Sequence, residues 1–87
     1  MSTIVVVDIG NTSTSVALAR HGKITNLRFK PSWSLTNPRA VWELLAPAIR
    51  GKRLDGSVLC SVVPRLNGVW TSQLRKTAGT PPLLLRR

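Results

Sequence analysis

Two short, continuous apolar runs restrict the fold of this chain more than any other feature. Residues 3–9 are Thr-Ile-Val-Val-Val-Asp-Ile, followed by a glycine, and residues 57–63 are Ser-Val-Leu-Cys-Ser-Val-Val, followed by a proline. Runs of this length without regular alternation are typical of strands buried on both faces in the middle of a parallel sheet. Because parallel strands need a long crossover between them, usually a helix, the sequence predicts an α/β fold.

Two further strands are expected between these runs. Residues 14–20 alternate small and branched apolar side chains, and residues 23–30 continue the pattern less regularly, with His21-Gly22 as a two-residue turn between them. Period-two alternation across such a turn indicates a hairpin. Together with the first run, these segments predict a three-stranded antiparallel meander.

Two helices and a last strand complete the prediction. Thr36 or Asn37 is expected to cap a helix that has Pro38 in its first turn and ends at Gly51, with an apolar stripe of Val41, Leu44, Leu45, Ala48 and Ile49. Pro47 lies inside this helix and predicts a kink in its last turn. A weaker helix is expected over residues 68–77, capped by Asn67 and closed by Gly79, followed by a short strand at residues 83–85. The predicted order is βββαβαβ.

The chain is expected to form one small domain over residues 1–87, and its charge balance is unusual for such a domain. The sequence contains thirteen Lys and Arg residues but only three Asp and Glu residues, which gives a formal net charge of +10. Such an excess suits nucleic-acid phosphates, an anionic membrane surface or small phosphorylated ligands. The basic residues are scattered without a run of five or six, so no compact basic arm is expected.

Cysteine content and hydropathy point to a cytoplasmic protein. The lone Cys60 excludes an internal disulfide and a multi-cysteine zinc site, which fits a reducing compartment. The amino terminus has no basic region before its short apolar run, so no signal peptide is expected. No stretch approaches the roughly 18 apolar residues of a membrane span.

The segment from Asp8 to Thr14, Asp-Ile-Gly-Asn-Thr-Ser-Thr, carries the strongest chemical signal. Gly10 allows a ligand to approach the backbone, successive amides can cradle phosphate oxygens, and the three hydroxyls add donors. Asp8 can hold a magnesium ion through water. The alternative is an ordinary hairpin turn in which Asn11 and Thr12 bond only their own backbone.

Three features together resemble the amino-terminal half of type III pantothenate kinases. They are Asp-x-Gly-Asn-Thr on the first strand, the βββαβαβ order, and Cys60-Ser61-Val62-Val63-Pro64 at the end of the fourth strand. These kinases belong to the superfamily of acetate and sugar kinases, actin and heat-shock chaperones. The resemblance extends from about residue 3 to residue 85 and implies a ribonuclease-H-like, actin-type ATPase domain with a mixed sheet, of which this chain is the first domain only.

The resemblance also implies a site and an activity. The residues expected to bind ATP phosphates are Asp8, Ile9, Gly10, Asn11, Thr12, Ser13, Thr14 and Ser15, with Asp8 near the magnesium. The family phosphorylates pantothenate to 4′-phosphopantothenate in coenzyme A biosynthesis, uses a monovalent cation (potassium or ammonium), and is typically homodimeric. Cys60 is then a strand residue and not a nucleophile.

The active site is expected to be incomplete in this chain, which has well under half the usual length for the family. No catalytic residue is assigned, because the family's catalytic aspartate and pantothenate pocket lie mostly beyond this segment. Besides Asp8, the carboxylates are Glu43, on the first helix, and Asp55, in a turn, and neither is placed to be a general base.

The basic charge supports a second hypothesis: a nucleic-acid-binding or transcription-regulatory module of the Bvg accessory factor type, a role known within the same family. Trp33, Trp42 and Trp70 lie among basic residues and suit base stacking, although packing in the core or at a domain interface is the favoured interpretation. His21, beside Gly22, is expected to be solvated and not a metal ligand. The leucines at 83–85 are expected to lie exposed on an uncovered strand.

Overall fold

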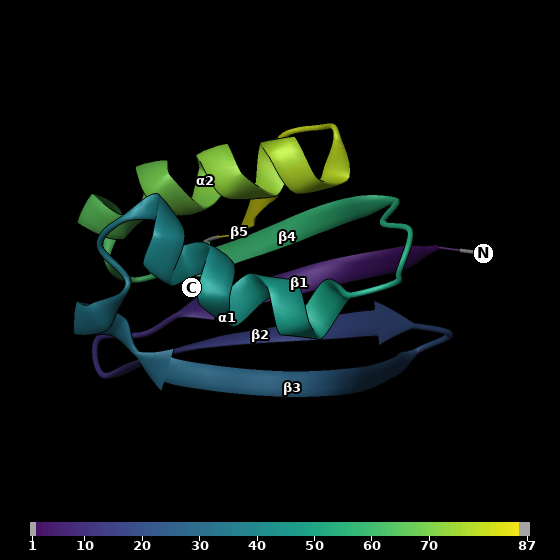
Figure 1. The fold of residues 1–87 in the computed structure, drawn as a ribbon, viewed down its shortest axis with the longest axis horizontal. Helices are drawn as coiled ribbons and strands as arrows, with labels where there is room; N and C mark the ends of the chain where they lie inside the picture. The colour runs from purple at the N-terminus through teal and green to yellow at the C-terminus, as the bar shows by residue number, and fades with distance from the viewer. Residues whose placement is uncertain (1, 86–87) are drawn as a thin grey trace.

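The computed structural model describes residues 2–85, and within that range a five-stranded mixed sheet carries two α-helices on one side (Figure 1). The elements are β1 (Thr3–Ile9), β2 (Ser13–Arg20), β3 (Lys23–Pro31), a 3-10 turn η1 (Ser32–Ser34), α1 (Pro38–Ile49), β4 (Gly56–Ser61), α2 (Pro64–Ala78) and β5 (Leu83–Leu85). The strand order is β3-β2-β1-β4-β5; β1 pairs antiparallel with β2 and parallel with β4. The predicted meander and the βββαβαβ order are confirmed.

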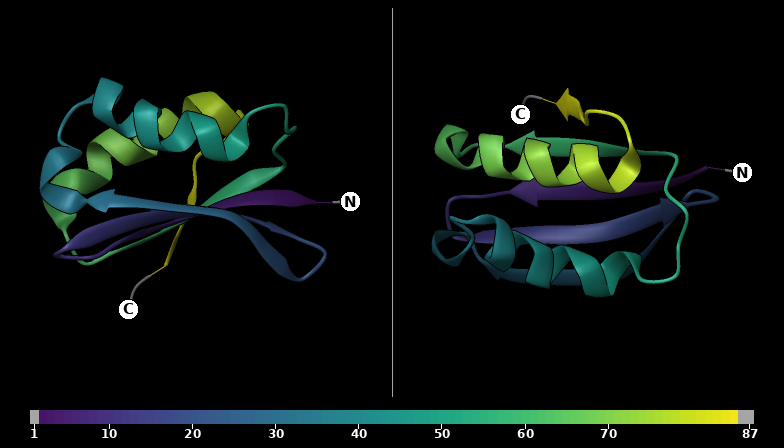
Figure 2. Two further views of the ribbon diagram at one scale, coloured as in Figure 1. Left: turned by 60° about the horizontal axis from the view of Figure 1, so that its bottom comes forward. Right: turned by 45° about the horizontal axis from the view of Figure 1, so that its top comes forward.

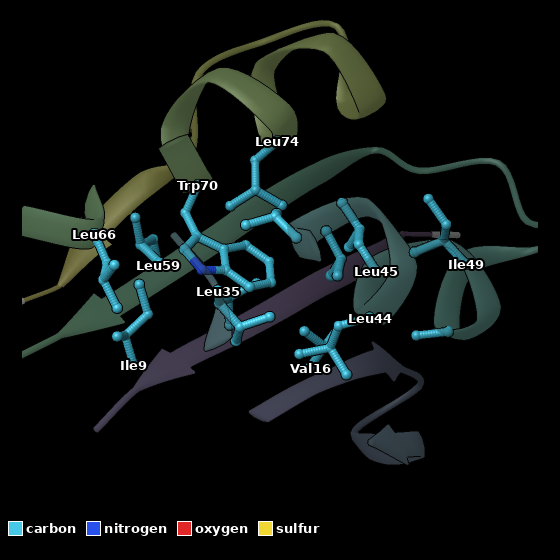
Figure 3. Close-up of a cluster of buried hydrophobic side chains, with 14 of the residues drawn as sticks. Ile9, Val16, Leu35, Leu44, Leu45, Ile49, Leu59, Leu66, Trp70 and Leu74 are labelled. Carbon is cyan, nitrogen blue, oxygen red and sulfur yellow. The ribbon is translucent and has the colours of Figure 1, made fainter. Parts of the chain in front are cut away.

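The core lies between the sheet and the two helices. Val5, Val7 and Ile9 of β1 are buried on the helix side, and all five residues of the predicted α1 stripe join the same cluster (Figure 3). Asn37 caps α1, because its side-chain oxygen accepts the backbone N–H of Ala40 at 2.9 Å. Leu66, Trp70 and Leu74 of α2 belong to this cluster as well, so one core joins the sheet to both helices.

The second helix differs from its prediction. It runs from Pro64 to Ala78, so the predicted cap Asn67 lies inside the helix and the predicted start at residue 68 is wrong. The cause is Pro64, which stands at the first helical position, where its missing N–H costs nothing. Gly79 closes the helix in a left-handed conformation, φ +82°, as predicted.

The three tryptophans have different environments. Trp70 of α2 is fully buried in the core, between Leu66 and Leu74 along the helix (Figure 3). Trp33 and Trp42 are 73% and 46% exposed. Core packing is therefore confirmed for Trp70. Trp33 and Trp42 do not pack in the core of residues 2–85, and for these two the alternative of packing at a domain interface stays a prediction.

The opposite side of the sheet carries neither helix (Figure 2, left). Side chains alternate along a strand, so the strand residues that do not face the helices form a second surface, the open sheet face. It is apolar over most of its width; it consists of Ile4, Val6, Asp8, Ser15, Ala17, Ala19, Ile24, Leu27, Phe29, Val58, Cys60, Leu83 and Leu85. The predicted exposure of the leucines in β5 is confirmed.

The third strand contains a bulge, which explains the irregular alternation in its sequence. The β2–β3 register shifts between Val16 and Leu18, and Asn26 adopts a left-handed φ of +55°. The Asn26 side chain donates to the backbone oxygen of Ala48 in α1 at 3.3 Å. Across residues 2–85, neither helix is long and apolar enough to cross a membrane.

Candidate functional site

The predicted phosphate-binding stretch forms the β1–β2 hairpin at one end of the sheet. The Gly10 N–H donates to the Ser13 backbone oxygen at 2.9 Å and closes a tight turn. A Cβ on Gly10 would lie 3.0 Å from that same oxygen, which is a tighter contact than most Cβ atoms make. A side chain here would therefore push the Ser13 backbone by a few tenths of an ångström, so the hairpin geometry favours glycine.

Buried hydroxyl groups of Ser32 and Thr14, which we call the Ser32 relay, hold this turn on its helix side. The Ser32 hydroxyl donates to the Gly10 backbone oxygen, and its oxygen lies 2.8 Å from Thr14 Oγ1. Since the one proton of Ser32 goes to Gly10, the Thr14 hydroxyl donates to Ser32. The Ser32 N–H also donates to the Thr12 oxygen at 3.0 Å. Three bonds from a 3-10 turn thus fix both sides of the hairpin.

The sequence alone does not identify Ser32 as part of the site. It lies in a loop between a proline and an exposed tryptophan, where no local pattern distinguishes it from a solvated serine. Its burial and its partners come from residues 18 and 22 positions away in the chain. Only a prediction of long-range contacts would have identified it.

The front of the hairpin offers hydrogen-bond donors to solvent. Asn11, Thr12 and Ser13 are exposed, and the turn's hydrogen bonds leave the N–H groups of Asn11 and Thr12 without a partner in the described part of the chain. Two adjacent free amides and two hydroxyls suit an anion with several oxygens. A hollow of about 500 Å³, lined partly by Phe29 and Trp33, adjoins the turn.

Asp8 lies at the carboxyl end of β1, one residue before the turn. It is exposed and lies on the open sheet face, with Ser15 and Cys60 as its neighbours in the β2 and β4 registers. Magnesium usually keeps several waters and is held by one or two carboxylates plus the substrate's phosphates. An exposed carboxylate close in sequence to the amides of Asn11 and Thr12 fits that ion.

The remaining members of the predicted stretch have supporting positions. Ile9 and Thr14 are fully buried on the helix side, so the Thr14 hydroxyl serves the Ser32 relay and does not face solvent. Ser15 is partly buried on the opposite face, across from Asp8. Within the stretch, Asp8 and Asn11 to Ser13 are therefore exposed, Ile9 and Thr14 are buried, and Gly10 and Ser15 are half-buried.

The other candidate groups lie away from the hairpin. Glu43 forms an exposed ion pair with Arg39 on α1, at 3.4 Å. Asp55 accepts the Thr3 N–H at 2.8 Å at the opposite end of β1. His21 is exposed in its turn, and no group of three metal-ligating side chains occurs within residues 2–85.

Residues 4–87 match the sequence profile of type III pantothenate kinases. The chain belongs to the type III pantothenate kinase family. A type III pantothenate kinase of Thermosipho melanesiensis is 31% identical over 78 residues, which are 90% of this chain but 31% of that protein. The chain therefore spans about a third of the length of this relative.

Solved structures place the fold in the actin-like ATPase group, as the sequence predicted. A ROK hexokinase from Thermus thermophilus superposes with a TM-score of 0.64 at 16% identity, over 97% of this chain and 35% of the hexokinase. YeaZ from Pseudomonas aeruginosa gives a TM-score of 0.64 at 21% identity, over 99% of this chain and 43% of YeaZ. At these identities the likeness shows the fold alone.

Proposed function

We propose that this chain supplies the ATP-phosphate-binding part of a type III pantothenate kinase. Such a kinase transfers the γ-phosphoryl group of ATP to pantothenate and gives 4′-phosphopantothenate, a step of coenzyme A biosynthesis. One observation carries the proposal: in a chain of this family, the β1–β2 turn presents the free N–H groups of Asn11 and Thr12 beside an exposed carboxylate. Because the chain spans 31% of the curated relative, the transfer is proposed for the whole protein.

The residues have separate tasks in this proposal. The amides of Asn11 and Thr12 and the hydroxyls of Thr12 and Ser13 hold phosphate oxygens and orient the chain of phosphates. Asp8 would hold a magnesium ion, which would supply positive charge against the phosphates. The Ser32 relay keeps the amides in place before the nucleotide arrives, so little reorganisation is needed at binding.

The base that activates the pantothenate hydroxyl is assigned to a part of the protein outside this chain. Among residues 2–85, Glu43 is paired with Arg39 and Asp55 holds the start of β1, so neither faces the hairpin. The pantothenate pocket, the monovalent-cation site and the homodimer contacts are likewise proposed for the remainder of the kinase.

Nucleotide titration followed by backbone amide NMR tests the proposal. A non-hydrolysable ATP analogue with magnesium is expected to shift the amides of residues 10–13 first. Asp8→Asn is expected to weaken magnesium-dependent binding by about tenfold, which corresponds to about 1.4 kcal/mol. Glu43→Gln removes the same charge from an exposed carboxylate on α1 and serves as the matched control.

Two results would contradict the proposal. One is that the nucleotide shifts backbone amides elsewhere in the chain and leaves those of residues 10–13 unchanged. The other is equal weakening by Asp8→Asn and Glu43→Gln, which would mean that Asp8 contributes only to the net charge.

A further inference from the structure

Five residues with basic side chains meet at the end of the sheet remote from the hairpin. Arg20 ends β2, His21 lies in the next turn, Lys23 begins β3, and Lys52 and Arg53 follow α1. We call this group the basic end cluster. Its members are exposed and come from two segments about 30 residues apart in the sequence, which the fold brings together.

The cluster surrounds two adjoining hollows. One, of about 490 Å³, is lined by Arg20, His21, Lys23 and Lys52, with Leu18 and Thr25 also in its wall. The other, of about 460 Å³, is lined by Arg20, Lys52, Arg53 and Asp55. Arg20 and Lys52 line both, so one ligand can reach all four cations.

The charges of the cluster are not neutralised within the described chain. Arg39 pairs with Glu43 on α1, and neither residue belongs to the cluster. Four cations therefore face a single carboxylate, Asp55, and that side chain already accepts the Thr3 N–H at 2.8 Å. The carboxyl end of α1 adds only about half a negative charge. Attraction for an anion outweighs both opposing contributions.

The shape favours a compact ligand over a nucleic-acid duplex. Pockets for small molecules usually have volumes of about 300–1,000 Å³, and each hollow falls in that range. Asn26 stiffens the wall of the larger hollow, because its side chain is bonded to the Ala48 oxygen of α1. A concave site on fixed elements suits a molecule smaller than a strand of DNA.

We propose that the basic end cluster is a second anion site, which binds a compact ligand carrying two or more phosphate groups. The site is separate from the hairpin, since Thr3 pairs with Arg20 at one end of β1 and Ile9 pairs with Thr14 at the other. Six residues of extended strand separate the two by about 20 Å. Binding here needs neither Asp8 nor magnesium.

The test uses inorganic triphosphate in the presence of a magnesium chelator, with backbone amide NMR as the readout. Shifts are expected at residues 20–23 and 51–53, with affinity that falls as salt rises. The double variant Lys23→Gln/Lys52→Gln is expected to weaken binding about tenfold or more, about 1.4 kcal/mol. Arg75→Gln/Lys76→Gln removes the same charge from the exposed last turn of α2 and is expected to change affinity less than twofold.

Several outcomes would overturn the proposal. Equal loss in the two double variants would mean that only the net charge attracts triphosphate. Shifts confined to residues 10–13, or no shifts, would leave the cluster without a ligand of this class. Single-stranded DNA that binds the cluster more than tenfold tighter than triphosphate would make nucleic acid the ligand.

The test also separates this proposal from the kinase function. Asp8→Asn is expected to leave triphosphate affinity at the cluster unchanged, whereas it weakens magnesium-dependent nucleotide binding at the hairpin. Thermal unfolding of each variant shows whether it is still folded, so that a loss of binding is not mistaken for a loss of structure.

Discussion

Replacing Ser32 with alanine is the sharpest test of how the hairpin is held. The Ser32 side chain is 1% exposed and links the Gly10 oxygen to the fully buried Thr14 hydroxyl. Ser32→Ala deletes both bonds at once. It also leaves the Thr14 hydroxyl buried without its partner, while the partly exposed Gly10 oxygen can turn to water.

The expected loss of stability follows from these two groups. A buried polar group left unsatisfied costs about 1–3 kcal/mol, and a hydrogen bond that water replaces costs about 1 kcal/mol or less. Ser32→Ala should therefore destabilise the fold by about 2–3 kcal/mol. For a domain of this size each kcal/mol corresponds to about 4–8 °C in the melting temperature.

A double-mutant cycle separates the orphaned hydroxyl from general damage. Thr14→Val removes one bond but leaves Ser32 donating to Gly10, so it should cost about 1 kcal/mol. Ser32→Ala/Thr14→Val buries no unpaired hydroxyl and should cost no more than Ser32→Ala alone. Urea unfolding measures all three. Additive losses, or a Ser32→Ala loss below about 0.5 kcal/mol, would refute the relay.

Three further substitutions test other parts of the structure. Pro47→Ala should stabilise the fold by about 2 kcal/mol and so raise the melting temperature, because α1 continues to Ile49 and proline removes an internal hydrogen bond. A lower melting temperature in thermal unfolding would contradict this. Gly10→Ala should destabilise the hairpin by about 1–3 kcal/mol in urea unfolding, since its Cβ meets the Ser13 oxygen at 3.0 Å; an unchanged midpoint would be inconsistent with the tight turn. Leu27→Lys on the open sheet face should leave stability within about 0.5 kcal/mol but reduce binding of a hydrophobic dye. Undiminished dye fluorescence would mean that Leu27 does not belong to that apolar surface.

Local patterns predicted the elements but misplaced several boundaries. The strand predicted over residues 57–63 ends at Ser61, the helix predicted to end at Gly51 ends at Ile49, and α2 begins four residues before its predicted start. The β-branched run of β1 and the spaced stripe of α1 each contain their own periodicity, so both were predictable. A proline such as Pro64 is compatible with two local structures, because it can follow the end of a strand or be the first residue of a helix. Its role as a strand terminator was expected, yet the chain enters α2 there, which leaves Asn67 inside the helix.

Contacts between distant residues account for what the sequence did not predict. The relay joins Ser32 to residues 18 and 22 positions earlier. The basic residues seemed scattered along the chain, and only the sheet places Arg20 and Lys23 next to Lys52. Trp42 lies outside the apolar stripe predicted for α1 and is exposed, whereas no local pattern predicts the exposure of Trp33.

The central position of β1 has a consequence for the order in which the fold forms. Its contacts with the hairpin and Ser32 close loops of up to about 22 residues, whereas Thr3 and Asp55 at the junction with β4 are 52 residues apart. Closing the longer loop costs about 0.8 kcal/mol more in entropy. We expect the meander with its β1–β2 turn to form in the folding nucleus, and β4 with α2 to dock later.

Stopped-flow kinetics would show this order directly. Ser32→Ala should mainly slow folding, and Leu59→Ala in β4 should mainly speed unfolding. A Leu59→Ala variant that slowed folding as much as Ser32→Ala would reverse the order. If the order holds, the β1–β2 turn takes shape before the parallel half of the sheet exists.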